Sequence, residues 1–445
     1  MGALISAEDR NRILVSALLL SLPFAVIVLN SYVDQFFITS QGKSAVLAYA
    51  IALPVEALFF AIGSVLAAGV AVIVKRKLTA GDTEGARFAA MNAVFYSVPL
   101  SVISTVVLLI VLNIAIPFIG KEAVRDCFSE FLTPFVYFFL ITTLNAILCG
   151  VMAAQGMRKA YTVCLIISFA LNAVFDQFYI HILDLGVMGN AFGTLTGALA
   201  SLVIAVVVLT RPNVTVRLSF RGFSQQMVGI RNVFSSMHLG LLRTVAKYLA
   251  ELAIRTMLFT TFSLTYGVPM LYASVIGVVG SAISAALTVE FKRLFEQKAR
   301  KQAYDTFLYF AAVGFITMLV LAVLISLFAP TFASVFLTHG SMRESRRMMA
   351  WTISILCFSA PFLGLREISD AVFSPTERMK YSIGSYVGLQ IIKVIAFAVM
   401  LSISFQAAMY YMVLERAVTG VFTFFTARRF LLRNYGGSEA GSSVS

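Results

Sequence analysis

The chain is dominated by a succession of apolar segments, each long enough to cross a lipid bilayer as a helix. A spanning helix needs about 20 predominantly apolar residues. We predict such helices at residues 13–39, 45–74, 88–116, 131–155, 160–182, 187–210, 236–262, 266–290, 304–330, 348–374, 381–403 and 405–428. Only 12% of the residues are charged and 60% are hydrophobic, whereas a soluble domain has about 25% charged residues. The sequence therefore predicts an all-α polytopic membrane protein with 12 transmembrane helices, and leaves no room for a large water-soluble domain.

Basic residues lie mostly in the loops on one side of the predicted membrane. Most of the 34 Lys and Arg residues fall on the side of the N-terminus, for example Lys75 to Lys77, Lys292 and Arg428. Because basic loops stay in the cytoplasm, we expect a multi-pass protein of the plasma (inner) membrane with both termini cytoplasmic. Anionic lipid headgroups then balance the net charge of +13, and we expect no nucleic acid partner.

The second half of the chain repeats features of the first half. A basic loop at Lys75 to Lys77 follows the second segment, and one at Lys292 and Arg293 follows the eighth. Pro117 and Pro330 end the third and ninth segments. Six helices per half is an even number, so the halves have the same orientation, which predicts two six-helix bundles related by a parallel pseudo-twofold repeat. We predict an N-terminal lobe at residues 1–210, a cytoplasmic linker at 211–235, a C-terminal lobe at 236–430 and a flexible tail at 431–445.

Ionisable side chains within the predicted helices mark candidate functional positions, because each costs at least about 2.5–3.5 kcal/mol at membrane depth. In the first half these are Asp34, Glu56 and Asp176. Asn172 lies one turn before Asp176 on the same helix face, and Thr194 lies at a similar depth. Carboxylate, amide and hydroxyl oxygens are what a monovalent cation or a proton relay needs. The alternative is that Asp34 and Asp176 only mark the outer ends of their helices.

A regular row of charges marks the predicted seventh helix. Arg243, Lys247, Glu251 and Arg255 recur at every fourth position and share one slowly drifting face. Surplus positive charge cannot face hydrocarbon. We therefore expect this row to line a cavity and to favour substrates with an anionic or acceptor group. The alternative is a structural salt bridge of Glu251 with Lys247 or Arg255.

Motifs for other chemistries are missing. The sequence has no GxxxxGK loop and no DDxxD pair, and its four cysteines stand singly, without metal-ligand spacing. We expect no enzyme activity, no cofactor and no metal beyond a monovalent Na⁺. A stripe of small residues at Gly189, Gly193 and Gly197 predicts close approach of two helices.

Several motifs resemble those of the multidrug and toxic compound extrusion (MATE) transporters of the MOP flippase superfamily. They are Val33-Asp34, Gln41-Gly42, Pro54-Val55, Gly81-Asp82-x3-Ala86, Gln155-Gly156-x2-Lys159, Asn172-x3-Asp176 and Gly186-Val187-x-Gly189-x3-Gly193-Thr194. The resemblance runs from about Pro23 to Thr210 and is weaker in the second half. Asn30 stands where the family has a tyrosine, with Tyr32 displaced from that position.

The resemblance implies export of amphipathic small molecules by alternating access, coupled to inward H⁺ or Na⁺. Carried over residue by residue, the coupling cluster is Asp34, Asn172, Asp176 and Thr194. One branch of the family couples through a glutamate of the seventh helix and an aspartate of the tenth, which Glu251 and Asp370 resemble in type and rough position only.

Substrate-cavity candidates complete the sequence predictions. They are Asn30, Tyr32, Glu56, Arg243, Lys247, Glu251, Arg255 and Asp370. We expect a monomer whose partners are a small-molecule substrate and the lipid bilayer. A second interpretation is a flippase for an anionic lipid-linked precursor. A third, a membrane-embedded enzyme, needs a metal or phosphate motif that the sequence lacks.

Overall fold

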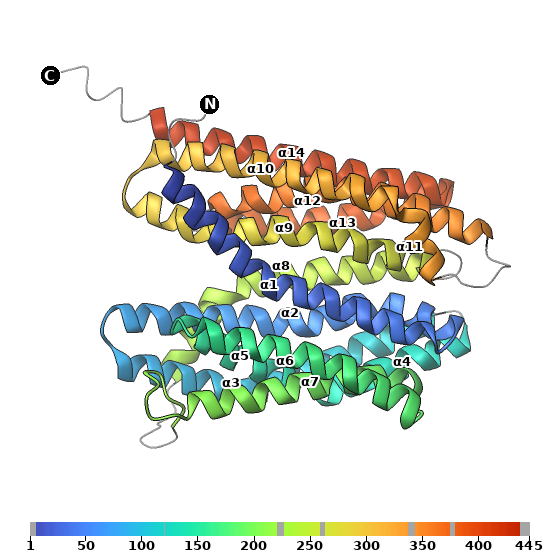
Figure 1. The fold of residues 1–445 in the computed structure, drawn as a ribbon, viewed down its shortest axis with the longest axis horizontal. Coiled ribbons are helices and arrows are strands. Elements are labelled where there is room, and N and C mark those ends of the chain that lie inside the picture. The colour runs from blue at the N-terminus through green and yellow to red at the C-terminus, as the bar shows by residue number, and fades with distance from the viewer. Residues whose placement is uncertain are drawn as a thin grey trace. The chain divides into compact units, whose positions relative to one another are not determined.

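A computed structural model describes residues 6–119, 121–219, 227–258, 263–336, 343–373 and 379–436. All regular structure in these ranges is helical, and they contain no strand (Figure 1). The helices are α1 (Ala7–Thr39), α2 (Lys43–Thr79), α3 (Thr83–Ala115), α4 (Glu122–Tyr137), α5 (Phe139–Ala154), α6 (Arg158–Gln177), α7 (Gly186–Leu209), α8 (Met227–Leu258), α9 (Ser263–Glu296), α10 (Arg300–Leu327), α11 (Ala329–Phe336), α12 (Arg343–Phe373), α13 (Met379–Ile403) and α14 (Phe405–Gly436), with short η1 (Ile116–Phe118) and η2 (Phe178–Ile182).

The helices account for the predicted membrane spans. In the described part of the chain, eight helices are long and apolar enough to cross a membrane, and the bent pair α4 and α5 provides a ninth span. Helices α1, α8 and α14 are 33, 32 and 32 residues long. Ionisable residues lie in the middle of α8 and α14, which lowers their mean hydropathy. With these three, the described ranges contain twelve segments of spanning length, as the sequence predicted.

One predicted helix is broken. The segment predicted at 131–155 begins earlier, at Glu122, and divides at Phe138 into α4 and α5, which meet at a bend of 53°. Pro134 lies in the last turn of α4. The apolar pattern alone did not reveal this break.

The chain forms two compact units. Unit 1 contains residues 1–29, 264–385 and 392–445, and unit 2 contains residues 30–263 and 386–391. Unit 1 thus holds the first part of α1 with most of α9 to α14, and unit 2 holds the rest of α1 with α2 to α8. These units differ from the lobes that we predicted at residues 1–210 and 236–430. The start of α1 belongs to unit 1, whereas α8 and residues 386–391 of α13 belong to unit 2. Grouping in space follows packing partners that chain order does not specify.

Two helices extend into the predicted linker and tail. Residues 227–235, placed in the linker, belong to α8, and α14 continues to Gly436 inside the predicted tail. The start of the linker is held in place by unit 2. Val216 donates its amide to Oε1 of Gln155 at 2.7 Å, and the Gln155 side chain donates to the Val216 carbonyl at 3.3 Å. Residues 220–226 and 437–445 lie outside the described ranges.

A capped turn explains one of the sequence motifs. Gly81 adopts a φ of 77°, a left-handed conformation that glycine takes without steric cost. Asp82 then begins α3, its side chain accepting the Gly85 amide hydrogen at 2.8 Å and the Lys77 ammonium at 2.7 Å. The Lys77 ammonium and the Gly85 amide hold the pKa of Asp82 below its usual range. The Gly81-Asp82 motif therefore forms the turn and the N-cap of α3.

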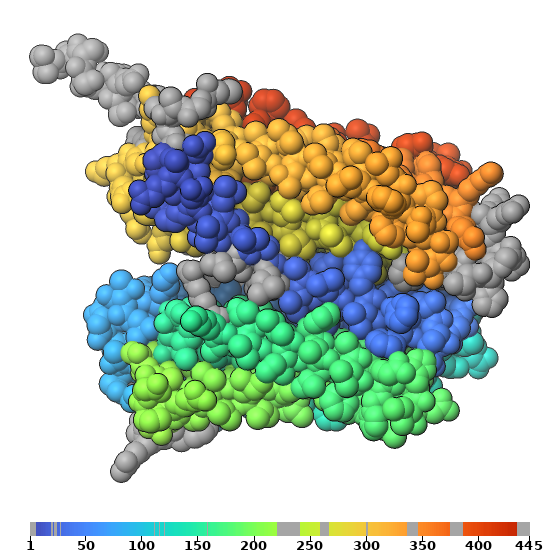
Figure 2. Space-filling model, viewed as in Figure 1, coloured from blue at the N-terminus to red at the C-terminus, as the bar shows by residue number. Residues whose placement is uncertain are grey.

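Aromatic packing fills the core of unit 2. The ring of Tyr49 on α2 packs edge-on against Phe131 of α4 with centroids 5.1 Å apart, and Phe59 meets Phe139 at 5.2 Å. All four side chains are buried. In the space-filling view, the green segments of α6 and α7 lie against one another (Figure 2). These contacts fix the depth and rotation of α2 relative to α4 and α5.

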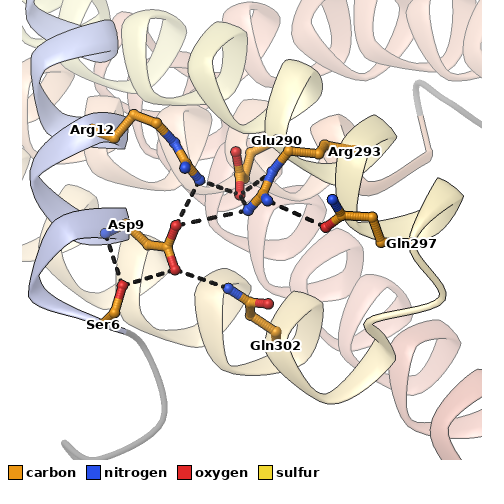
Figure 3. A network of polar contacts seen from close by, with 7 residues as sticks. All are labelled: Ser6, Asp9, Arg12, Glu290, Arg293, Gln297 and Gln302. Carbon is orange, nitrogen blue, oxygen red and sulfur yellow. Dashed lines mark hydrogen bonds and ion pairs between the residues drawn. The ribbon is translucent and has the colours of Figure 1, made fainter.

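A polar network within unit 1 joins the start of α1 to α9 and α10 (Figure 3). The Arg12 guanidinium donates to Glu290 Oε1 at 3.0 Å and pairs with Asp9 at 2.7 Å. Arg293 pairs with the same Glu290 oxygen, and Gln302 donates to Asp9 at 3.1 Å. Glu290 is 7% exposed, so this carboxylate organises two guanidinium groups.

We expect Glu290→Gln to lower the free energy of unfolding by about 1 kcal/mol, because both guanidinium partners are more than a third exposed and therefore screened. Detergent-solubilised protein unfolded with denaturant provides the measurement. The matched control is Glu84→Gln, which removes the exposed pair of Glu84 with Arg87 and should change little. Equal effects for the two variants would mean that the network does not hold α1.

Candidate functional site

The predicted coupling residues of α1 and α6 meet in the interior of unit 2. Asp34 and Asn172 are each 1% exposed. The Asn172 side chain donates one amide hydrogen to Asp34 Oδ1 at 2.8 Å and another to Asn30 Oδ1 at 3.1 Å. Asn30 therefore supports the cluster through Asn172. Asp34 lies in the protein interior and does not mark an exposed helix end.

Asp176 lies one turn after Asn172, and its carboxyl group neighbours that of Asp34. It is 0% exposed, and neither carboxylate oxygen has a hydrogen-bond partner among the described residues. A Cβ atom added to Gly193 of α7 would lie 2.0 Å from Asp176 Oδ1. One at Gly197 would lie 2.3 Å from the Ser168 carbonyl oxygen. The glycine stripe thus permits the predicted close approach of α6 and α7, and Gly193 also makes room for the Asp176 side chain.

Two further polar residues border the cluster, and neither was predicted from the sequence. Asn190 of α7 is 0% exposed and lies next to Asp34 and Asp176. The Tyr49 hydroxyl lies beside Asp34. Asn190 could have been predicted, because it is an amide side chain one turn before Thr194 in a mostly apolar helix. The sequence contains no comparable signal for Tyr49, because its position near Asp34 depends on the packing of α2. Thr194 is buried, and its hydroxyl donates to the Asn190 carbonyl at 3.4 Å.

The cluster has the chemistry of a site for one small cation. Two ionised carboxyl groups side by side in a buried setting repel each other, and a proton or a metal ion between them removes that repulsion. In the described part of the chain, no Lys or Arg forms an ion pair with Asp34 or Asp176, and the Asn172 Oδ1 and Asn190 Oδ1 atoms are buried without hydrogen-bond partners. Carboxylate and amide oxygens suit a hard ion such as Na⁺, so these residues fit either H⁺ or Na⁺.

Glu56 of α2 is a third buried carboxyl group in unit 2. It is 6% exposed and lies near enough to Asp34 for the two groups to interact electrostatically. It follows Tyr49 by seven residues, so both lie on the same face of α2. We predicted Glu56 as a substrate-cavity residue, and the structure places it close to the carboxylate cluster.

The charged row of α8 has two different environments. Arg255 is 7% exposed, and its Nε donates to Glu251 Oε1 at 3.2 Å. The structural salt bridge left open by the sequence is therefore formed. The Arg243 guanidinium lies over the Tyr386 ring at 4.6 Å from its centroid, and Lys247 is exposed. That Arg243 and Lys247 line a cavity stays a prediction.

Arg255 also contacts α2 where Pro54 interrupts the helical hydrogen bonds. Pro54 lies inside α2 and has no amide hydrogen, so the carbonyl four residues earlier, that of Ala50, loses its usual helical donor. Arg255 Nη1 donates to that carbonyl oxygen at 2.5 Å. An unsatisfied buried carbonyl costs about 1–3 kcal/mol. Arg255 thus stabilises the proline-containing part of α2, between Tyr49 and Glu56.

We expect the effects of Arg255→Met and Pro54→Ala on the free energy of unfolding to be coupled by about 1–2 kcal/mol, because an alanine in place of Pro54 restores the missing amide donor. A double-mutant cycle of unfolding in detergent measures this energy. Pro99→Ala in α3 is the matched control and should be additive with Arg255→Met. Additivity of Pro54→Ala as well would show that the carbonyl contact contributes nothing.

The remaining candidates from the sequence are Asp370 and Tyr32. Asp370 is a half-buried residue of α12 in unit 1, whereas Glu251 belongs to unit 2. The two residues that resembled a second coupling pair are thus in different compact units. Tyr32 is a half-buried residue of α1.

Comparisons with known proteins agree with this architecture. Residues 19–178 match the MatE family model, and no curated protein matches the chain. The chain superimposes with a TM-score of 0.81 on an inward-facing multidrug resistance MATE family transporter of the MOP superfamily, at 18% identity over 94% of this chain and 96% of that one. The chain has the fold of the MATE transporters. The MATE resemblance predicted from Pro23 onward is confirmed by these matches.

Two other MATE-fold structures show the breadth of the likeness. An outward-facing multidrug resistance MATE family transporter gives a TM-score of 0.76 at 17% identity, over 96% of each chain. A MOP superfamily transporter from Pyrococcus furiosus Vc1 gives 0.78 at 18% identity, over 95% of this chain and 96% of that one. It is described as having a binding pocket of reverse polarity that suggests a different function. At these identities the MATE likeness establishes the fold.

Proposed function

We propose that this protein is a secondary active antiporter that exports amphipathic small molecules by alternating access, driven by inward movement of H⁺ or Na⁺. The observation that carries the proposal is the buried pair of Asp34 and Asp176, with Asn172 hydrogen-bonded to Asp34. An ionisable side chain buried at membrane depth lowers the stability of the protein, so its presence points to a function. The MATE fold and the many apolar helices support a role in moving molecules across a membrane.

Each residue of the cluster has a distinct role in this proposal. Asp34 and Asp176 hold the cation, and Asn172 fixes the orientation of the Asp34 carboxyl group through its 2.8 Å hydrogen bond. Asn190 and Thr194 of α7 supply further amide and hydroxyl oxygens. Binding and release of one cation change the local charge by one unit, and this change biases the conformation of the helices that carry the cluster.

Purified protein in proteoliposomes tests the proposal. A cationic dye is enclosed, and an H⁺ gradient and a Na⁺ gradient are imposed separately. One gradient should drive the dye against its own concentration gradient, and collapse of that gradient with an ionophore should stop the movement. Dye movement that is equal with and without gradients would rule out coupled antiport.

A flippase for an anionic lipid-linked precursor is the second candidate. The half-buried and exposed cations of α8 support it, as does the reverse-polarity pocket described for the transporter from Pyrococcus furiosus. The two functions separate in cells: an exporter raises resistance to cationic dyes, and a flippase leaves it unchanged.

We also propose residence in the plasma (inner) membrane as a monomer, with both termini cytoplasmic. The concentration of Lys and Arg on one side supports this orientation. Cysteines introduced singly near each end and labelled with a membrane-impermeant maleimide in intact cells test it, since neither end should react.

A further inference from the structure

Arg416 is a buried arginine of unit 1, and it has no role in the proposed cation cluster of unit 2. It lies in the middle of α14, which packs against α10 and α12. Arg416 is 5% exposed. Such a position is unfavourable for a guanidinium unless charges or strong acceptors surround it.

Among the described residues, only neutral groups hold this guanidinium. Its Nη1 donates to the Ser359 hydroxyl oxygen of α12 at 2.7 Å, and its Nη2 donates to the Met270 sulfur of α9 at 3.4 Å. No carboxylate in the described part of the chain pairs with Arg416. Glu415 is its neighbour in sequence, but adjacent residues of a helix do not face each other. A thioether sulfur is a weak acceptor, so the positive charge is poorly compensated.

Arg255 provides an internal comparison. It is a buried arginine of similar exposure, yet it reaches both a carboxylate, Glu251, and a freed backbone carbonyl, that of Ala50. Its environment is that of a structural arginine. Arg416 has neither kind of partner in the described ranges, and its guanidinium still has donors to offer, since it carries five N–H groups in a planar fork.

The surroundings of Arg416 indicate the class of molecule that it binds. A guanidinium fork matches the two oxygens of a carboxylate or sulfonate. The groups around it, Met270 and the fully buried Cys357, are weakly polar or apolar. A ligand for this position therefore combines an anionic head with an apolar body.

We propose that Arg416, oriented by Ser359, is a binding site in unit 1 for the carboxylate or sulfonate group of an amphipathic organic anion. The binding site is inferred from the contacts of Arg416 alone. Its use in transport depends in addition on the exporter function proposed above. It adds organic anions to the substrate range of a carrier whose cation cluster lies in unit 2.

Equilibrium binding to the full-length protein in nanodiscs tests the site, with protein-free nanodiscs subtracted. The probes are 1-naphthoate and 1-naphthylmethylammonium, which share a ring system and carry opposite charge. We expect saturable binding of naphthoate that weakens at least about tenfold in Arg416→Gln, the loss expected for a charge-assisted hydrogen bond. Binding of the cationic probe should be unchanged. Arg429→Gln, which removes the same charge from an exposed position of α14, should leave naphthoate binding intact.

Two further variants keep the test valid if Arg416→Gln does not fold. Arg416→Lys should retain part of the naphthoate binding, because the charge stays while the fork is lost. Ser359→Ala should weaken naphthoate and spare the cation. Absence of saturable naphthoate binding, or equal binding by the Arg416→Gln and Arg429→Gln variants, would overturn the proposal. Arg416-dependent binding without gradient-driven movement of naphthoate or dye would instead count against the exporter function alone.

Discussion

Replacement of Asp34 by asparagine is expected to abolish gradient-driven export while leaving the protein folded. Asparagine has nearly the same shape, and its carbonyl oxygen can still accept the hydrogen bond that Asn172 donates at 2.8 Å. It cannot take up a proton or present a full charge to Na⁺. Because no Lys or Arg among the described residues pairs with Asp34, the substitution leaves no buried cation unpaired, so stability should be kept.

The measurement is dye export from proteoliposomes under the gradient that drives the unmodified protein. Export by Asp34→Asn should fall to the level of protein-free vesicles, with a thermal unfolding midpoint close to that of the original protein. Asp126→Asn is the matched control, because Asp126 is an exposed residue of α4, and it should export normally. A wild-type rate for Asp34→Asn would show that coupling resides elsewhere.

The second large effect is expected at Gly193. Its added Cβ in Gly193→Ala would lie 2.0 Å from Asp176 Oδ1 and 2.9 Å from the Asp176 backbone nitrogen. The carboxyl group must leave its position, or α6 and α7 must separate. Overpacking of this kind costs about 1–3 kcal/mol, and displacement of Asp176 should also remove export from the molecules that fold.

Gly277 supplies a control with the same chemical change. It lies within α9, and an added Cβ there meets no atom within 4 Å. Gly277→Ala should therefore be neutral or stabilising by up to about 1 kcal/mol, the difference in helix propensity. Unfolding in detergent and dye export are measured for both variants. Normal export by Gly193→Ala would mean that the Asp176 position is not needed for coupling.

Helix positions followed from the sequence because their cause is local. About 20 apolar residues are needed to cross a bilayer wherever they occur, and the ends of α7 and α13 lie within a few residues of the predicted ends. The relation of Asn172 to Asp176 was equally local, since both lie on one face of α6. The break at Phe138 was not predicted, because apolar character alone does not show where a helix bends.

The site required tertiary packing to be complete. Asp34 lies far from Asn172 in the chain, and only the packing of α1 against α6 creates the hydrogen bond between them. Asn190 and Tyr49 join the cluster because α7 and α2 present them there. The sequence marked the carboxyl groups by their cost in a membrane, and it marked Asn172 by its helical spacing from Asp176. Asn190 and Tyr49 were not predicted, because neutral side chains carry no such cost and their approach to the carboxyl groups depends on packing.

The two buried arginines show which contacts follow from helical spacing in the sequence and which depend on packing between helices. Helical spacing determined that Arg255 shares a face with Glu251, and their ion pair follows from it. The contact of Arg255 with the Ala50 carbonyl depends on how α8 packs against α2. Arg416 has a carboxylate beside it in sequence, yet its partners are the hydroxyl of Ser359 and the sulfur of Met270. Sequence thus determines which charges enter the membrane and which of them share a helix face, and long-range packing decides which groups of other helices each charge meets.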